Sequence, residues 1–299
     1  MKSRASAGRL PNGRPRMAAK PGITLVGPGR LGQALGKLLA DAGIPIRYVA
    51  ARRREAARRA ARFIGSGLPV GLGSPDVADS PVILLTVSDA ALAPLARQLA
   101  SRPYGWQGKV VLHTCGALPS SVLAPLKQRG AAIGSLHPFQ TIPDPATGSR
   151  NLPCSFWAIE GDAQACSVAM QFVRALEGIP FRVRPPWKVL YHAAAFLSCP
   201  GLVTLLDQSA RLLRNAGVPA GIIRPMLGRF VTETVGNFVR LGGRRALTGP
   251  AVRGDWETIA RHLRALRRHA PEVLPLYRPL LRAMVRLARR REPSHGKQP

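Results

Sequence analysis

The stretch that decides the fold is Ile23-Thr24-Leu25-Val26-Gly27-Pro28-Gly29-Arg30-Leu31-Gly32, a short apolar run followed by a Gly-x-Gly-x-x-Gly pattern. The run predicts a buried strand, and the spacing of the leucines after it predicts a helix that stops at Gly43. Between a strand and a helix, these glycines allow a tight turn, close approach of a pyrophosphate and close helix packing, and the helix N-terminus supplies N–H donors. The pattern predicts a dinucleotide site, with a ligand-free glycine turn as the alternative. The expected contacts are Gly27, Gly29, Arg30, Leu31 and Gly32.

The end of the next predicted strand, residues 46–50, indicates which dinucleotide the site prefers. Sites specific for NAD place an Asp or Glu there to bind the ribose 2′-hydroxyl. This chain has Arg52 and Arg53 at that point and no carboxylate before Glu55. Guanidinium groups bind a phosphate through paired hydrogen bonds, whereas a carboxylate would repel it. We therefore predict NADP as the cofactor, with Arg52 and Arg53 on its 2′-phosphate; a solvated basic helix start is the alternative.

The first half of the chain has the pattern of an α/β domain. Apolar runs typical of buried strands recur at residues 82–87, 110–113, 131–135 and 156–159, and helical stretches are expected to about residue 63, at 89–100 and at 118–128. Such alternation is typical of a doubly wound, mainly parallel sheet, whose ligands bind at the carboxyl ends of the strands. Further expected cofactor contacts at those ends are Thr86, Val87, Ser88, His113 and Thr114. A core role for His113 and a helix cap at Asp89 are the alternatives.

After about residue 185 the pattern changes from strand-like to helical. Four long segments with helical spacing of their apolar residues follow, at 187–215, 219–241, 255–268 and 271–290. We therefore expect a disordered basic tail over residues 1–20, a Rossmann NADP-binding domain over 21–185 and an all-α domain over 186–293. A small helical domain seldom buries such apolar faces by itself, so this domain is expected to form a homodimer as well as to bind the substrate.

Lys188 and His192 are four residues apart and so share one face of the predicted helix. A lysine ammonium can protonate or polarise a carbonyl oxygen, and histidine titrates near neutral pH. We therefore predict that both are catalytic; a surface lysine beside a packed histidine is the alternative. The residues expected to bind the substrate are His137 and Gln140, which follow a strand, and Arg253 in a glycine-rich loop. A structural turn and an ion pair of Arg253 with Asp255 are the alternatives there.

The composition is that of a globular protein except for its charge. The chain has 44 Lys and Arg against 15 Asp and Glu, a formal net charge of +29. Much of the excess lies in residues 1–22, 47–62 and 261–291. A basic surface attracts nucleic acid. Aromatic residues are only 5% of the chain and do not interleave with the arginines as a base-stacking surface requires, so a nucleic-acid partner is not expected.

The spacing of the cysteines, the lack of a signal-peptide pattern and the lack of a membrane-span pattern together predict a cytoplasmic protein. The four cysteines show no Cys-x-x-Cys spacing and no cluster with histidine, so neither a metal site nor a disulfide framework is expected. The basic N-terminus lacks the apolar segment of a secretory signal peptide. No run of about 18 apolar residues without charge stands out, so no membrane span is expected.

The order of these motifs resembles the Rossmann-like oxidoreductase family whose helical half is the domain of unknown function 2520. The matching pieces are residues 27–32, 113–116, 137–141, 191–195, 248–250 and 253–255, which together span most of the chain. The family is similar in layout to pyrroline-carboxylate reductases, ketopantoate reductases and β-hydroxyacid dehydrogenases. The resemblance implies NADP, a cleft between the domains and dimerisation through the helical half. It also implies a lysine that works at the carbonyl, here Lys188, although relatives have asparagine where this chain has His192 and Cys199.

Three classes of function follow from these observations. The leading hypothesis is an NADP-dependent oxidoreductase that transfers a hydride to or from a small carbonyl, hydroxy or imine substrate. A non-catalytic nucleotide-sensing or interaction protein on the same fold is the first alternative, and a nucleic-acid binder is the second. Fold alone does not decide between them.

Overall fold

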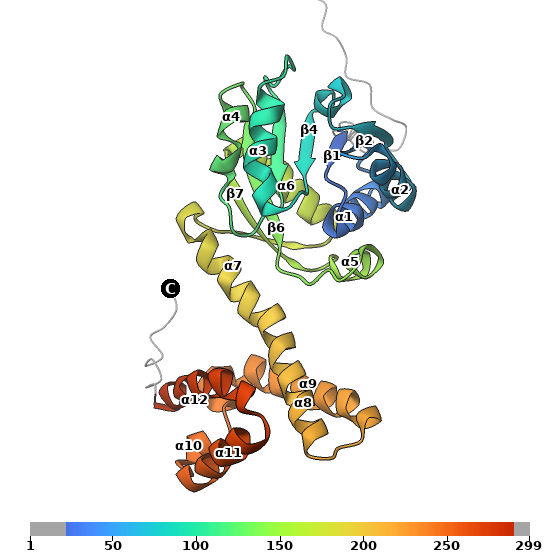
Figure 1. Cartoon of the computed structure of the whole chain (residues 1–299). Helices are drawn as coiled ribbons and strands as arrows, with labels where there is room; N and C mark the ends of the chain where they lie inside the picture. Colours follow the sequence, from blue (N-terminus) through green and yellow to red (C-terminus); the bar gives the residue numbers. More distant parts are fainter. Residues whose placement is uncertain (1–21, 290–299) are drawn as a thin grey trace, which may run out of the picture. The chain divides into compact units, whose positions relative to one another are not determined.

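The computed structural model describes residues 22–289, which form two compact units that divide after Leu197 (Figure 1). The tail predicted over residues 1–20 lies outside the described residues. The division comes later than the boundary predicted at residue 185, because helix α7 (Lys188–Phe196) belongs to the first unit.

The first unit is built on one eight-stranded sheet with the strand order β3-β2-β1-β4-β5-β6-β7-β8. Neighbouring strands run parallel except for β6 and β7, which are antiparallel. The strands are β1 (Ile23–Val26), β2 (Ile46–Ala51), β3 (Leu68–Gly71), β4 (Val82–Leu85), β5 (Val110–His113), β6 (Ala132–Pro138), β7 (Phe156–Gly161) and β8 (Ile179–Arg182). The predicted doubly wound, mainly parallel sheet is confirmed.

The two strands that the sequence analysis missed, β3 and β8, form the edges of this sheet. Their side chains are only partly covered, so neither strand has the apolar run that marks a buried strand. Each contains a proline, Pro69 or Pro180, a residue that sheets tolerate mainly at an edge because it cannot donate a hydrogen bond.

Helices cover both faces of the sheet (Figure 1). The helices α1 (Arg30–Asp41), α2 (Arg54–Ile64) and α6 (Ala163–Ala175) pack on one face. The helices α3 (Asp89–Ala100) and α4 (Ala124–Lys127) pack on the other, and the short α5 (Pro145–Asn151) contacts α1. Two separate apolar cores result, which hold the carboxyl ends of β1, β4 and β5 at one edge of a rigid sheet.

The second unit is helical, as predicted. Its helices are α8 (Leu202–Asn215), α9 (Ala220–Ala246), α10 (Pro250–Arg253), α11 (Trp256–His269) and α12 (Leu274–Arg289). Within residues 22–289 no strand follows Arg182. Gly242, with φ +74°, breaks α9 near its end, at the position where glycines interrupt the helical pattern of the sequence. A π-helical turn, η4 (Leu197–Gly201), joins α7 to α8.

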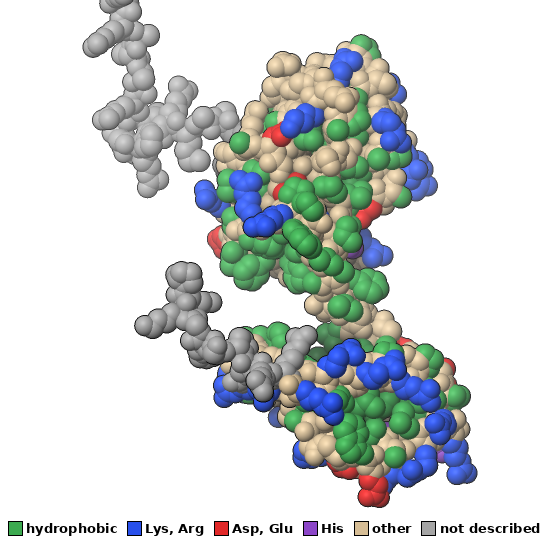
Figure 2. Space-filling view, turned by 90° about the vertical axis from the view of Figure 1, so that its left-hand side faces the viewer, with side chains coloured by type: hydrophobic (Ala, Val, Ile, Leu, Met, Phe, Trp, Pro, Cys, Tyr) green, Lys and Arg blue, Asp and Glu red, His purple; other side chains and the backbone are tan. Residues whose placement is uncertain are grey.

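The helical unit has a very small core of its own. Its one described cluster of buried residues consists of Leu266, Ala270 and Val273. Ten large apolar side chains of its helices and loops remain exposed: Val203, Ile222, Met226, Phe230, Val235, Phe238, Val239, Val252, Trp256 and Leu276. Figure 2 shows such hydrophobic side chains on the surface, bordered by Lys and Arg. This helical unit therefore covers few of its own large apolar side chains.

The helical segment Pro185–Asn215 differs from what the sequence analysis expected. Among the described helices it is the one that is long and apolar enough, by length and composition alone, to cross a membrane. Polar but uncharged residues such as Tyr191 and Thr204 interrupt its apolar run, which is why a search for an unbroken run overlooked it. Its first turn is held in the first unit, because the side chain of Lys188 is buried there.

Candidate active site

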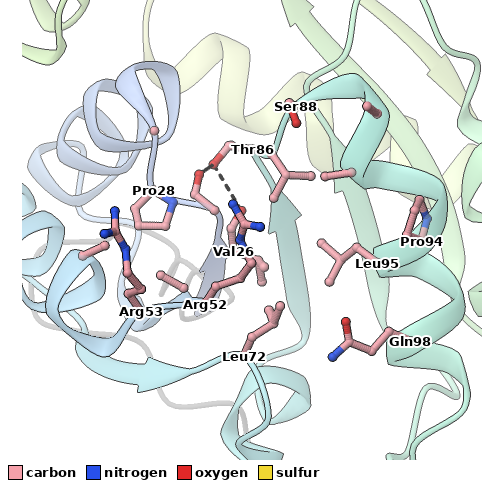
Figure 3. A pocket seen from close by; sticks show the side chains of 17 residues that line it. Val26, Pro28, Arg52, Arg53, Leu72, Thr86, Ser88, Pro94, Leu95 and Gln98 are labelled. Atoms are coloured by element: carbon pink, nitrogen blue, oxygen red, sulfur yellow. Dashed lines mark hydrogen bonds between the residues drawn. The ribbon is translucent and has the colours of Figure 1, made fainter.

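A pocket of about 630 Å³ lies at the carboxyl ends of β1, β2 and β4 (Figure 3). Strand order reverses beside β1, so this is the point of the sheet at which nucleotides bind in doubly wound folds. Seventeen residues line it: Val26, Gly27, Pro28, Gly29, Ala51, Arg52, Arg53, Ala56, Leu72, Thr86, Val87, Ser88, Ala90, Ala91, Pro94, Leu95 and Gln98. Seven of these are among the predicted cofactor contacts.

The glycine turn has the tight geometry that its spacing predicts. Gly27 adopts a φ of +81°, and a Cβ built on it would lie 2.3 Å from Cγ1 of Val87. A Cβ on Gly32 would lie 2.3 Å from Oγ1 of Thr86, and that hydroxyl donates a hydrogen bond to the carbonyl of Gly27 at 2.7 Å. Helix α1 therefore packs directly on the end of β4, and its N-terminus faces the pocket.

The pocket also contains the charges that a phosphate needs. Arg52 and Arg53 are exposed and come from the end of β2, on the opposite side of the pocket from Leu95 and Gln98 of α3 (Figure 3). None of the seventeen lining residues is an Asp or Glu. This donor set fits a 2′-phosphate better than a free ribose hydroxyl, so the pocket fits NADP.

The other predicted cofactor residues lie outside the pocket lining. Arg30 is exposed at the start of α1, and Leu31 packs against the core. His113 and Thr114 are buried at the end of β5. His113 accepts a hydrogen bond from the backbone N–H of Cys115 at 3.1 Å, and burial lowers its pKa to about 3. The side chain of His113 is thus a neutral core residue, the alternative given above.

Lys188 lies in a buried polar network. Only 2% of its side chain is exposed. Its ammonium donates to the carbonyl of Cys115 at 3.2 Å, to Oγ of Ser135, and to Oε1 of Glu160 at 3.2 Å. Glu160 also accepts hydrogen bonds from the backbone N–H and the hydroxyl of Ser120, both at 2.7 Å. The three N–H donors of Lys188 are therefore occupied by the protein.

Sequence analysis missed Ser120, Ser135 and Glu160. Ser135 and Glu160 are paired residues of β6 and β7, so the antiparallel pairing of these strands brings them together. Glu160 is the acidic residue in the otherwise apolar run Phe156–Gly161. A carboxylate in a buried strand needs a cation, and that rule could have indicated a partner for it.

Next to this network lies a group of aromatic side chains. His137, at the end of β6, lies with Nδ1 2.8 Å from the hydroxyl of Tyr191 on α7, and its ring is 6.0 Å from that of His192. Gly116, after β5, makes room for both histidines, since a Cβ there would lie 2.7 Å from Nε2 of His137 and 2.8 Å from Cδ2 of His192. The structure thus brings the predicted residues His137, Lys188 and His192 together at the carboxyl ends of β5 and β6.

The two remaining predicted substrate residues are Gln140, in the first unit, and Arg253, in the second. Gln140 is exposed; its amide donates to the carbonyl of Asn151 at 3.0 Å and accepts from the N–H of Thr141, so it orders a turn. Arg253 is exposed in the second unit, and Asp255 caps α11 by accepting from the N–H of Thr258 at 3.0 Å. Within residues 22–289 no group of three His, Cys, Asp or Glu could hold a metal ion.

Comparisons with known proteins agree with this architecture. A crystal structure from Bacteroides fragilis, provisionally named an NADP oxidoreductase, has a TM-score of 0.71 and 22% identity, covering 90% of this chain and 99% of its own. An imine reductase of Myxococcus stipitatus in complex with NADP+ has a TM-score of 0.63 and 17% identity, and the match covers 90% of this chain and 93% of that one. A pyrroline-5-carboxylate reductase of Coxiella burnetii has a TM-score of 0.56 and 15% identity, and the match covers 90% of this chain and 97% of that one. At these identities the likeness establishes the fold.

No curated protein matches the chain. Two family models do, and they cover successive parts of it. Residues 11–138 match a Rossmann-like domain, and residues 155–284 match a domain of unknown function, DUF2520. The protein therefore combines an N-terminal Rossmann-like domain with a C-terminal domain of the DUF2520 family.

Proposed function

We propose that the protein is an NADP-dependent oxidoreductase that transfers a hydride to or from a small carbonyl, hydroxy or imine substrate. The observation that carries the proposal is the pocket at the ends of β1, β2 and β4, which combines the glycine turn with Arg52 and Arg53 and has no carboxylate in its lining. Relatives of the same fold include one named for NADP and one bound to NADP+, which supports the choice of cofactor.

In this proposal, different residues bind the cofactor, contact the substrate and hold helix α7 in place. When bound, the cofactor supplies or accepts the hydride. The glycine turn and the N-terminus of α1 bind its pyrophosphate, and Arg52 and Arg53 bind the 2′-phosphate. His137 and His192, which lie past the carboxyl end of β5, face the substrate. Lys188 holds α7 in place through Ser135 and Glu160 instead of donating to the substrate, because its N–H groups are occupied.

Replacement of Arg52 or Arg53 by alanine tests the cofactor assignment. Each change should weaken NADPH binding about tenfold, because a charge-assisted contact to the 2′-phosphate is lost. The affinity for NADH should hardly change, since NADH has no phosphate at that position. Isothermal titration calorimetry with both cofactors measures the difference.

Arg58→Ala is the matched control, because Arg58 is exposed on α2, the helix that directly follows Arg52 and Arg53, and lies outside the pocket lining. It should leave both affinities within a factor of about two. If Arg52→Ala lost affinity for NADPH and NADH equally, the arginine would act through the stability of the fold or the overall positive potential of the protein, and not through the 2′-phosphate. Tight NADPH binding without turnover of any tested carbonyl or imine would favour the nucleotide-sensing alternative.

We also propose that the second unit pairs with a second copy of the chain. A core cluster of three buried residues is small for a unit of about 100 residues. The apolar side chains of α9, such as Phe230 and Phe238, are exposed, and a second copy would bury them. A cytoplasmic location belongs to the same proposal. The four cysteines are free thiols, in keeping with a reducing compartment.

Light scattering tests the homodimer. The wild-type protein at micromolar concentration should have twice the mass of one chain, and Phe230→Asp should shift it to the mass of a single chain, since a charge would be buried in the interface. Thr232→Asp places the same charge on α9 at an exposed polar position and serves as the control. A wild-type monomer that co-sediments with phosphatidylcholine vesicles would instead assign the apolar surface to a membrane.

A further inference from the structure

The hydroxyl of Tyr191 is fixed in place by its surroundings. Its ring packs between Phe139 and Phe181, with centroid distances of 5.6 Å and 6.0 Å. Its oxygen lies 2.8 Å from Nδ1 of His137, and the two rings meet edge to face. Burial raises the pKa of Tyr191, so the phenol keeps its proton at neutral pH. The hydrogen bond that the structure shows for this hydroxyl is the one with Nδ1 of His137.

The chemistry of the two groups decides which one donates. Burial above all, with Lys188 adding to it, lowers the pKa of His137 to about 4, so the imidazole is neutral at pH 7. A phenol O–H is a stronger acid than the N–H of neutral imidazole, and the bare imidazole nitrogen is the better acceptor. Tyr191 therefore donates to Nδ1, and the ring proton of His137 resides on Nε2.

The second nitrogen of His137, Nε2, is not used by the hydrogen bond with Tyr191. Nε2 lies 2.7 Å from the place where a Cβ of Gly116 would be, so the ring edge rests against the loop that follows β5. Among the described residues Nε2 has no hydrogen-bond partner. The carboxyl ends of β4 and β5 are also the direction in which the fold extends the cofactor away from Arg52 and Arg53. A substrate beside the cofactor would thus meet an N–H donor.

We infer that Tyr191 is a positioning residue that fixes His137 as a neutral Nε2–H donor, and that the reacting group of the substrate is a hydrogen-bond acceptor, a ketone or aldehyde oxygen, and not a protonated iminium. An iminium N–H would meet the N–H of His137 head-on, donor against donor. A carbonyl oxygen would accept from Nε2, which polarises the C=O bond toward hydride attack. The choice between carbonyl and iminium rests on the proposed oxidoreductase function, whereas the tautomer of His137 does not.

Long-range 1H–15N correlation spectra of protein labelled with 15N-histidine test the inference at neutral pH. The signals of His137 are identified by their loss in His137→Asn. In the wild-type protein Nε2 of His137 should resonate as a protonated nitrogen and Nδ1 as a bare one. In Tyr191→Phe this single pattern should give way to averaged shifts of two tautomers, while the buried His113 keeps its pattern and so reports that the fold is intact.

Tyr277→Phe is the matched control, because Tyr277 holds Nδ1 of His262 at 2.9 Å in the same edge-to-face geometry in the second unit. It should change the signals of His262 and leave those of His137 unchanged. A wild-type His137 protonated on Nδ1, or a pattern that Tyr191→Phe does not alter, overturns the positioning role. The wild-type spectrum decides the tautomer even if Tyr191→Phe fails to fold.

The substrate class is tested on the NADPH-saturated protein with two probes of similar size, cyclohexanone and the permanently cationic 1-methyl-1-pyrrolinium. The ketone should shift the Nε2–H signal of His137, and the cation should not. A shift with the cation, or with neither probe, overturns the assignment to carbonyl substrates. Calorimetry on the same sample distinguishes a failure of the proposed function from a failure of the inference about His137. If the protein does not bind NADPH, the proposed function is refuted, but the result on the tautomer of His137 remains valid.

Discussion

Replacing Lys188 by methionine is expected to reduce the free energy of unfolding by about 3–5 kcal/mol. Methionine fills similar space but removes the cation that faces Glu160, whose carboxylate is only 4% exposed. The remaining partner, Ser120, gives Glu160 two hydrogen bonds but no charge. A buried carboxylate without a counter-charge is among the most costly defects in a protein interior. Urea denaturation followed by circular dichroism measures the loss.

Lys127→Met is the comparison for this experiment. Lys127 pairs with Asp162 at the surface, where its side chain is 56% exposed, so its removal should cost less than about 1 kcal/mol. The double variant Lys188→Met/Glu160→Gln should recover part of the stability lost in Lys188→Met, because the unpaired charge is gone. If Lys188→Met were as stable as Lys127→Met, the network would not hold Lys188, and its predicted role as a catalytic acid would stand again.

The glycine turn gives the second large effect. Gly27→Ala should lower the free energy of unfolding by about 2–5 kcal/mol, because alanine is strained at a φ of +81° and its Cβ would lie 2.3 Å from Cγ1 of Val87. Binding of NADPH and NADH should be lost with the turn. Thermal or urea unfolding, together with cofactor titration, measures both effects.

Gly29→Ala separates the two functions of the turn. The nearest atom to a Cβ on Gly29 is the carbonyl oxygen of Thr86 at 4.0 Å, and its φ is −74°, so stability should change by no more than about 0.5 kcal/mol. The methyl group would occupy the place where the backbone must approach a pyrophosphate, so both cofactors should bind at least about tenfold more weakly. Unchanged affinities in Gly29→Ala would place the phosphates elsewhere.

The sequence predicted the fold well because its strongest patterns are local. The strands next to the glycine turn are buried on both faces and so appear as apolar runs, and the helices after residue 185 have clear helical spacing. Arg52 and Arg53 could be placed at the pocket because a strand end is a fixed position in a parallel sheet. The edge strands β3 and β8 lack such a pattern and were missed.

The substrate side of the site was harder to predict because it depends on contacts between distant residues. The sequence singled out Lys188, but its partners Ser135 and Glu160 come together only through the antiparallel pairing of β6 and β7. A lysine in sequence gives no sign of whether its ammonium meets solvent or a carboxylate. Tyr191 belongs to a recognised motif, yet its role follows only from the 2.8 Å distance to His137.

The exposed arginines at the start of α2 have a consequence for the rate at which a ligand arrives. Arg52 and Arg53 at the pocket directly precede the short helix α2, which carries the exposed Arg58, Arg59 and Arg62, so the positive potential extends into solvent well beyond the pocket itself. Such a field raises the association rate constant of an anion by guiding its diffusion, and dissolved salt weakens it within a Debye length of about 8 Å at physiological ionic strength. For an anionic dinucleotide, capture by this protein would therefore slow with rising ionic strength, while the close contacts that govern its escape would be much less affected.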